Sequence, residues 1–552
     1  MFFKRLLLLL ILGVIQNLPA NNPPNVIVIM VDDMGYSDIG CYGGEIKTPN
    51  LDKLAAYGLR IRQFYSTGKC HSSRVSLLSG LHSYQAGELG KNGTIKMHNG
   101  NIARGVSLAQ VLRKAGYFTA VSGKWHISPE PLNMGFNRFF GFLPGYVKDY
   151  FACKKLELNG TPYVHKGTEN RYITDQITDY GIKFFEEAQA REKPCFLYLA
   201  YNAPHYPLQA PQEDINKYKG KYLKGYLDTH KQRIEKMKRL KLIEDNWSPA
   251  SAEEVKLRDW NAFSQEERNY QDLLMATYAA MIDRIDQNIG RLVKTLESSG
   301  ALDNTLILFF SDNGATEATM VHEREQHERK LSMSTNDSFT VYGDWAYVSN
   351  APFRLFKTHM HEGGVISPLI AHWPKGISVP GGSIDHKNMF QLIDIMPTLV
   401  DICGANYPDT YDGRKIEPMK GVSMLPSFKG QQADRKEGMY FMFGLNRAYR
   451  LGDWKLVSKG TSRWELYNLA DDPTEKNDLA TKNPEKVELL KKMWWKIAKE
   501  DERLPPQISK PNSDKSAVYK RFLMRQGNNR VPGLNEADLK KRYGKGVKGI
   551  KK

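Results

Sequence analysis

The chain has few cysteines for its length and, after its first twenty residues, no long apolar run. Five cysteines in 552 residues are too few for a disulfide-stabilised scaffold. Four of them can be buried thiols or form one or two bridges, and the sequence leaves both open: Cys41, Cys153, Cys195 and Cys403. No stretch beyond residue 20 is long and apolar enough to cross a bilayer, so we expect no stable membrane span.

Acidic residues are also in the minority. The chain carries 61 Asp and Glu against 78 Lys and Arg, a formal net charge of +17. Such a chain attracts anions, among them nucleic acid, acidic membranes and polyanionic substrates. Much of the excess positive charge lies at 217–241 and 540–552. These segments either form solvated faces or attract a polyanion over a long range. No zinc-finger, RRM or helix-turn-helix pattern accompanies the charge, so we expect no nucleic-acid partner.

The first twenty residues have the pattern of a secretory signal peptide. Lys4 and Arg5 give a charged start, an apolar run covers 6–15, and Leu18-Pro19-Ala20 resembles a cleavage site. The run is short for a membrane span, which favours a cleaved signal over an anchor. We therefore expect an exported protein, periplasmic or secreted.

Three apolar runs rich in β-branched residues, at 25–31, 195–200 and 305–310, do not alternate with polar residues. Each predicts a strand that is buried on both faces, as in a parallel sheet. Polar residues follow all three runs, and in open α/β sheets the sites lie beyond the carboxyl ends of the strands. We therefore expect one site from the residues that follow them: Asp32, Asp33, His205, Asp312 and Asn313.

Helical patterns lie between the predicted strands. An apolar stripe from Tyr278 to Leu292 predicts a helix that runs to about residue 299, and Val106 to Ala115 predicts another. Alternating strands and helices predict an α/β fold with a large mixed, mostly parallel central sheet flanked by helices, over residues 21–437.

The end of the chain has a different pattern. Residues 438–505 predict a smaller C-terminal α+β domain, with a short antiparallel sheet from 447–457 and 464–467 and a helix over about 484–499. Residues 506–552 are rich in Lys, Gly, Pro and Asn and predict a basic C-terminal extension.

Asp32, Asp33, Asp312 and Asn313 are short oxygen donors of the kind that hard divalent cations prefer. An isolated Asp-Asp pair can also cap a helix or a turn, but the Asp-Asn pair after a second strand favours a cation site. Ligation by oxygen alone favours Ca2+ or Mg2+ over zinc.

Cys70-His71-Ser72-Ser73-Arg74, with Ser79-Gly80 after it, resembles the signature of the type I, formylglycine-dependent sulfatases. In that family a cysteine or serine is followed by x-P/A-S-R, four residues and T-G. Further stretches are similar to motifs of its bacterial arylsulfatase branch, in the alkaline phosphatase superfamily: 123–126, 204–208, Lys357 five residues before Glu362-Gly363-Gly364, 446–448, 452–456 and 464–467. The resemblance covers most of residues 25–480 and implies an alkaline phosphatase-like fold.

The resemblance implies that Cys70 is oxidised by a sulfatase-maturing enzyme to formylglycine (3-oxoalanine). One Ca2+, rather than Mg2+, would be bound by Asp32, Asp33, Asp312, Asn313 and the modified Cys70. Arg74 would hold and polarise residue 70. The sulfate would be gripped by cationic and imidazole side chains: Lys124, His126, His205 and Lys357. His205 is the first choice for the general acid, followed by Lys357, and His126 would help to collapse the intermediate.

The implied activity is hydrolysis of a sulfate ester, from an O-sulfated carbohydrate, to an alcohol and inorganic sulfate. A hydroxyl of the formylglycine hydrate would attack sulfur to give a covalent sulfo-enzyme intermediate. Two alternatives stay open: a phosphate or phosphonate monoester hydrolase of the same superfamily, and a non-catalytic protein that binds sulfated glycans.

Two departures from the family pattern bear on function. Ser72 stands where Pro or Ala is usual, which affects recognition by the maturing enzyme, and Ser79 replaces Thr. Phe441-Met442-Phe443-Gly444-Leu445 replaces a W-E-H-E-G stretch of several relatives, so an apolar surface replaces a sugar-binding histidine. The segment 207–272 follows His205 directly, contains the basic residues at 217–241, and is a candidate wall or lid of the site.

Overall fold

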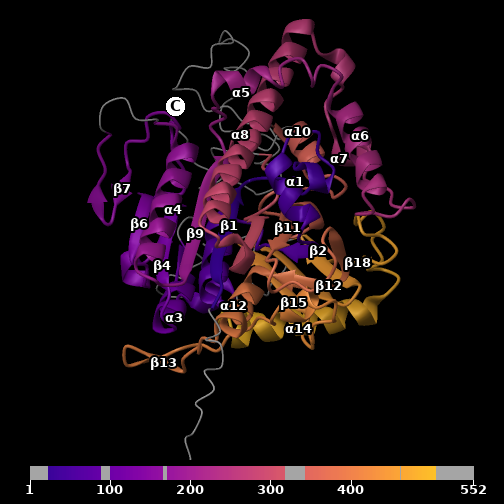
Figure 1. Ribbon diagram of the computed structural model, residues 1–552. Helices are drawn as coiled ribbons and strands as arrows, with labels where there is room; N and C mark the ends of the chain where they lie inside the picture. Colours follow the sequence, from indigo (N-terminus) through magenta and orange to yellow (C-terminus); the bar gives the residue numbers. More distant parts are fainter. Residues whose placement is uncertain (1–22, 89–99, 166–170, 318–341, 461, 505–552) are drawn as a thin grey trace, which may run out of the picture.

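The computed structural model describes residues 23–88, 100–165, 171–317, 342–460 and 462–504 (Figure 1). The predicted signal peptide at 1–20 and the predicted extension at 506–552 lie outside these residues. None of the helices in the described ranges is long and apolar enough to cross a membrane.

A ten-stranded sheet forms the centre of the molecule, in the order β12-β2-β11-β10-β1-β9-β4-β6-β7-β8. Neighbouring strands from β10 to β6 pair in parallel, whereas β11 runs antiparallel to both β10 and β2. This confirms the prediction of a large mixed, mostly parallel sheet. Its strands are β1 (Asn25–Asp32), β2 (Leu59–Tyr65), β4 (Phe118–Lys124), β6 (Arg138–Phe142), β7 (Glu157–Leu158), β8 (Thr161–Pro162), β9 (Cys195–Pro204), β10 (Thr305–Ser311), β11 (Ile366–His372) and β12 (Ser383–Gln391).

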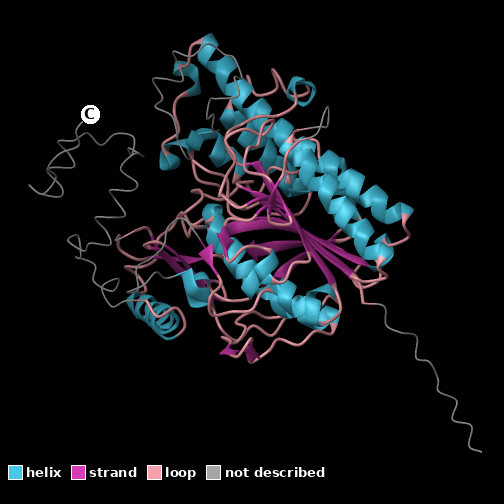
Figure 2. Ribbon diagram, turned by 90° about the vertical axis from the view of Figure 1, so that its left-hand side faces the viewer, coloured by secondary structure: helices cyan, strands magenta, loops and turns pink. Residues whose placement is uncertain are grey.

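Helices cover both faces of the sheet (Figure 2). Every residue of β1 is buried, and its side chains alternate between two apolar cores, as expected for a strand covered on both sides. Ile27 and Ile29 belong to one core, and Val28 and Met30 to the other. The first core contains α1 (Pro49–Ala56), α4 (Ile173–Ala190) and α8 (Gln265–Ser298), and the second contains α2 (Cys70–Ser79), α3 (Leu108–Lys114) and α12 (Ile395–Cys403).

The helix predicted from the stripe at Tyr278 begins earlier, at Gln265. A capping box fixes this start, because the Ser264 side chain accepts from the Glu267 backbone and the Glu267 carboxylate accepts from Ser264 N at 2.7 Å. The first turn faces solvent and carries no apolar stripe, so periodicity alone did not find it.

A separate antiparallel sheet forms near the end of the described chain, in the order β15-β16-β17-β18. The helix α14 (Pro484–Glu500) packs on it through the buried Trp494, in a third apolar cluster. This confirms the small antiparallel sheet, although β15 was not predicted; the domain boundary at residue 437 stays a prediction. The strands are β15 (Met439–Phe443), β16 (Asn446–Leu451), β17 (Trp454–Ser458) and β18 (Glu465–Asn468).

Shorter elements connect these parts. They include α5 (Gln212–Asn216), α6 (Tyr226–Arg239), α7 (Ala252–Val255), α10 (Tyr342–Ser349), α11 (Glu362–Val365), α13 (Leu425–Phe428) and the strand pairs β3 (Gly100–Asn101) with β5 (Ile127–Ser128) and β13 (Thr410–Tyr411) with β14 (Arg414–Lys415). All five cysteines fall within the described ranges, where they are buried free thiols.

Candidate active site

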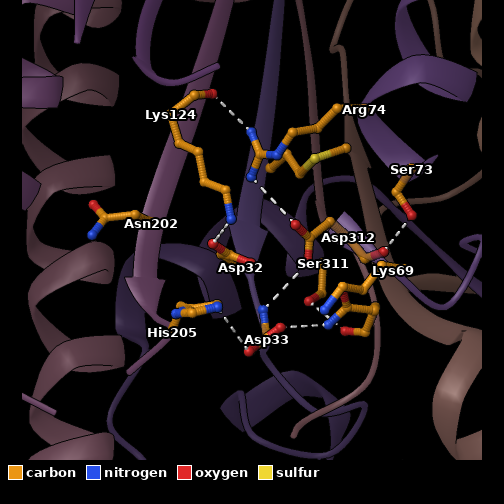
Figure 3. A network of polar contacts seen from close by, with 12 residues as sticks. Asp32, Asp33, Lys69, Ser73, Arg74, Lys124, Asn202, His205, Ser311 and Asp312 are labelled. Atoms are coloured by element: carbon orange, nitrogen blue, oxygen red, sulfur yellow. Dashed lines mark hydrogen bonds and ion pairs between the residues drawn. The ribbon is translucent and has the colours of Figure 1, made fainter. Parts of the chain in front are cut away.

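The carboxyl ends of four parallel strands carry the predicted site residues (Figure 3). Asp32 and Lys124 are the last residues of β1 and β4, Asp312 directly follows β10, and His205 directly follows β9. Because these strands run in the same direction side by side, their ends place these side chains at one edge of the sheet.

Cys70 reaches this edge from the other direction, as the first residue of α2. Its side chain is buried, and its Sγ atom lies with carboxylate oxygens of Asp32 and Asp312 within 4.8 Å of one another. In the present structure Sγ stands for the oxygen that formylglycine would carry at this position. The amino end of a helix favours negative charge, which suits a nucleophile or a sulfate there.

Buried oxygens without partners point to a cation between β1 and β10. Oδ1 of Asp32, Oδ2 of Asp33 and Oδ1 of Asn313 are buried and accept no hydrogen bond. The amide of Asn313 donates to Asp33 Oδ1 at 2.6 Å, which leaves its own oxygen free. Burial and the nearby Asp32 raise the pKa of Asp312 well above its usual range. The donor set is all oxygen, so these residues fit Ca2+ or Mg2+.

Each carboxylate of the site also has a cationic partner. Lys124 contacts Asp32, Lys357 contacts Asp33, and Arg74 Nη2 lies 3.3 Å from Asp312 Oδ2. All six side chains are at most 5% exposed, so the pairs act at low dielectric.

Arg74 is held by three acceptors. Its guanidinium donates to the Lys124 carbonyl oxygen at 2.9 Å and to the Tyr198 hydroxyl at 3.0 Å, besides the contact with Asp312. A guanidinium spreads its donors over separate nitrogens in one plane, so it reaches acceptors on several elements at once. Arg74 therefore connects α2 with β4, β9 and the end of β10.

Two histidines complete the site. His205 Nδ1 donates to the Tyr206 carbonyl oxygen at 2.7 Å, which turns Nε2 toward Asp33 Oδ2 at 3.6 Å. His126 has a φ of 63°, and its ring packs on His71 with a centroid distance of 5.5 Å. The ring also packs closely on Gly145, where an added Cβ would lie 2.4 Å from His126 Nε2 and would force the ring to shift.

Electrostatics at position 70 favour an anion. Burial raises the pKa of the Cys70 thiol, but Lys124 and Lys357 outweigh burial and hold the pKa well below its usual range. Burial also lowers the pKa of His126 to about 4. The pocket therefore stabilises negative charge on residue 70 and keeps His126 neutral at neutral pH.

Two positioning contacts were not predicted from the sequence. Tyr198, within the apolar run of β9, holds Arg74, and Ser73 Oγ donates to the Asp312 carbonyl oxygen at 2.6 Å. A hydroxyl inside a fully buried strand was the available signal for Tyr198, because a buried phenol needs a partner.

The departures from the signature have different surroundings. Ser79 Oγ donates to the Val75 carbonyl oxygen at 2.7 Å, a bond that threonine also makes, so the replacement is conservative. Ser72 is fully buried within α2. Phe443 lies beside the signature, with its ring 5.7 Å from that of His71 and 5.9 Å from Lys69 Nζ.

The basic segment at 217–241 divides into two parts. Arg233 is buried against Asp38 at 2.7 Å, and Lys217 lies 2.7 Å from Asp214. These two cations therefore serve the fold. Others are exposed: Lys219, Lys221, Lys224, Lys231, Arg239 and Lys241.

A mixed sheet with buried oxygen ligands, paired cations and a candidate nucleophile at one edge defines a hydrolase of the alkaline phosphatase-like fold. A family model described as Sulfatase matches residues 24–405, and a second, described as N-sulphoglucosamine sulphohydrolase, C-terminal, matches residues 353–503. The chain belongs to the sulfatase family of sulfuric ester hydrolases.

Individual relatives agree with this assignment. The chain is 35% identical over 435 residues to an arylsulfatase of Klebsiella aerogenes, covering 73% of this chain and 91% of that one. It is 33% identical to an uncharacterized sulfatase of Schizosaccharomyces pombe, covering 85% and 92%. The solved structure of Ps i-CgsB in complex with k-i-k-neocarrahexaose is similar with a TM-score of 0.64 and 25% identity, covering 92% and 99%.

Proposed function

We propose that this sulfatase is exported and releases sulfate from an O-sulfated carbohydrate, with Cys70 converted to formylglycine and one Ca2+ bound. The observation that carries the proposal is the position of Cys70, whose Sγ lies with oxygens of Asp32 and Asp312 within 4.8 Å at the amino end of α2. The cation would be held by Asp32, Asp33, Asp312, Asn313 and residue 70.

When present, formylglycine supplies a hydrated aldehyde as nucleophile, and the cation supplies positive charge opposite the sulfate oxygens. Arg74 holds α2, and thereby residue 70, against Asp312. Lys124 and Lys357 place ammonium groups around the sulfate, where charge develops as the ester bond breaks.

We assign proton transfer to the histidines. His205 Nε2 faces the carboxylate edge of the site, and because Nδ1 already donates to Tyr206 O, Nε2 carries a proton only in the imidazolium form. In that form, donation from Nε2 to the leaving oxygen makes His205 the general acid. Lys357 is the second choice, because it also contacts Asp33. His126, kept neutral by burial, is suited to accept a proton during sulfate release.

A comparison with a solved structure supports a carbohydrate as the substrate class. A similar solved sulfatase is titled as a complex with k-i-k-neocarrahexaose. The pattern of the first twenty residues supports export, and oxidation of Cys70 requires a sulfatase-maturing enzyme as partner.

The test is mass spectrometry of the peptide that contains residue 70, from protein produced together with a sulfatase-maturing enzyme. Trypsin would cut after Lys69 and after Arg74 and leave residue 70 in a very short peptide, 70–74, so a different protease is needed. We expect replacement of the thiol by an aldehyde, and sulfate release from 4-nitrophenyl sulfate that is absent in Cys70→Ala. An unmodified thiol in active protein would contradict the proposal.

Two comparisons sharpen the test. Ser72→Pro restores the usual signature, and higher aldehyde content in this variant would show that Ser72 limits maturation. Faster hydrolysis of phenyl phosphate or phenyl phosphonate esters than of aryl sulfate, at equal aldehyde content, would favour the phosphate or phosphonate alternative.

A further inference from the structure

The backbone of Asp33 has an uncommon conformation. Its φ is 66°, in the left-handed region, directly after β1 ends. Aspartate adopts this conformation more often than most residues other than glycine, but it is still uncommon, and neighbouring groups hold it here. Its carboxylate contacts Lys357 and Asn313, and its direction therefore decides the geometry of the site.

Tyr278 of α8 holds this backbone through its hydroxyl group. Its hydroxyl lies 3.1 Å from the carbonyl oxygen of Asp33 and 2.7 Å from Asp38 Oδ2. The one hydroxyl proton is thus shared between two acceptors. Tyr278 is buried, so neither acceptor is satisfied by bulk water.

Asp38 is in turn fixed from two sides. Its Oδ2 accepts from Gly35 N at 2.8 Å, which closes the turn that follows Asp33. Its Oδ1 accepts from Arg233 Nη1 at 2.7 Å, and Arg233 also forms two bonds with Glu45, at 2.7 and 2.8 Å. A guanidinium bound to two carboxylates in this way has little freedom to move.

Three helices at the same end of the sheet supply and support this network (Figure 1). Arg233 belongs to α6, Tyr278 to α8, and the α10 backbone accepts from Ser37, at Val348 O and Ser349 O. An added Cβ at Gly35 would lie 2.2 Å from Ser349 O, so the turn packs directly on α10.

We propose that Tyr278, Asp38 and Arg233 are positioning residues that hold the left-handed backbone of Asp33 and thereby raise the affinity of the site for its divalent cation. The inference rests on the cation site of the proposed function. It also gives a role to Arg233, the buried member of the basic segment, that is unrelated to attraction of a polyanion.

Tyr278→Phe is the informative substitution, because it removes the hydroxyl and keeps the buried ring. Loss of a partner that orients a metal ligand costs about 10–100-fold in metal affinity. Tyr117→Phe is a matched control. The buried Tyr117 hydroxyl donates to Pro24 O at 2.9 Å, immediately before the opposite end of β1, far from Asp33 along the strand.

The experiment is calorimetric titration of Ca2+ into full-length protein stripped with EDTA, together with melting temperatures with and without Ca2+. We expect a Kd at least tenfold higher for Tyr278→Phe than for wild type, and a smaller rise in Tm on adding Ca2+. Tyr117→Phe should bind Ca2+ within twofold of wild type. Asp38→Asn, which neutralises the acceptor, should weaken binding as Tyr278→Phe does.

Equal Kd values for Tyr278→Phe and wild type would overturn the inference, as would an equal loss in Tyr117→Phe. Wild-type protein that binds neither Ca2+ nor Mg2+ would overturn the cation site itself, and this result is recognised without any variant. If Asp38→Asn does not fold, the comparison between the two tyrosine variants still decides.

Discussion

Lys455 of the small antiparallel sheet lies 2.7 Å from Glu362 of α11, and neither side chain is more than 3% exposed. The same ammonium group lies 2.9 Å from Glu475, and Glu362 also accepts from the Tyr65 hydroxyl at 2.8 Å. Since Glu362 follows Lys357 by five residues, this ion pair connects the small sheet to the segment that carries Lys357, which we propose as an active-site lysine.

Lys455→Met should be strongly destabilising, because it leaves two buried carboxylates without their cation. We expect a loss of about 3–5 kcal/mol in the free energy of unfolding, measured by urea denaturation. Lys491→Met is the control, since Lys491 forms an exposed pair with Glu488, and such pairs contribute about 0–1 kcal/mol. Similar losses of unfolding free energy in both variants would show that the buried pair stabilises the fold no more than the exposed pair does.

Arg74→Lys should lower kcat far more than it lowers stability. Lysine keeps the charge, but its three donors lie on one nitrogen and lack the planar spread with which the guanidinium reaches Lys124 O, the Tyr198 hydroxyl and Asp312. We expect kcat to fall about 100-fold or more, per mole of formylglycine. The matched change at a surface pair, Arg138→Lys beside Glu187, should leave kcat within twofold. A mild effect at Arg74 would contradict its assigned role.

His205→Gln should discriminate between leaving groups. A general acid matters for a sugar alkoxide, which needs a proton to leave, and little for 4-nitrophenolate, which does not. We therefore expect kcat/KM to fall about 100-fold or more for a sugar sulfate, and much less for 4-nitrophenyl sulfate. If Lys357→Ala shows this selectivity and His205→Gln does not, the acid is Lys357.

His230 should make the protein less stable in acid. Burial lowers its pKa to about 3, and its ring stacks on Tyr347 at 4.2 Å. The unfolded chain, with an ordinary histidine pKa near 6.5, binds more protons, so stability falls as pH drops from about 7 toward 3.

His230→Phe keeps the stacking and removes this titration. The unfolding free energy of His230→Phe minus that of wild type should be about 2 kcal/mol more positive at pH 5 than at pH 7.5. The measurement is urea denaturation of both proteins at the two pH values. A difference between the proteins that does not change with pH would contradict this assignment.

The exposed part of the basic segment allows a test of substrate attraction. Replacing Lys219, Lys221, Lys224 and Lys231 with glutamine should raise KM for a sulfated polymer at low salt and leave KM for 4-nitrophenyl sulfate nearly unchanged. An equal change in KM for both substrates would show that these residues do not attract the polymer.

The sequence predicted those parts of the fold and site that depend on local patterns. The run at 25–31 indicated a strand covered on both faces, and the structure confirms this for β1. Polar residues at strand ends predicted that Asp32 and Asp312 lie together, because the carboxyl ends of parallel strands meet at one edge.

Contacts between distant segments could not be predicted in this way. Arg233 lies in a run of lysines and gave the pattern of a solvated face, yet it is buried because Asp38, 195 residues earlier, is its partner. The short strand β15 was not predicted, since its residues 439–443 are apolar but include no β-branched residue. The sequence predicted that Phe443 replaces a polar group, but it did not predict that the Phe443 ring lies beside His71.

The burial of Cys70 has a consequence for the order of events in the life of the chain. Every residue of α2 is buried, and Cys70 is 2% exposed. A modifying enzyme has to reach the side chain of residue 70, which the finished helix leaves buried. We therefore expect oxidation of Cys70 to precede folding, so that a chain that folds first keeps its thiol permanently and is inactive from the outset.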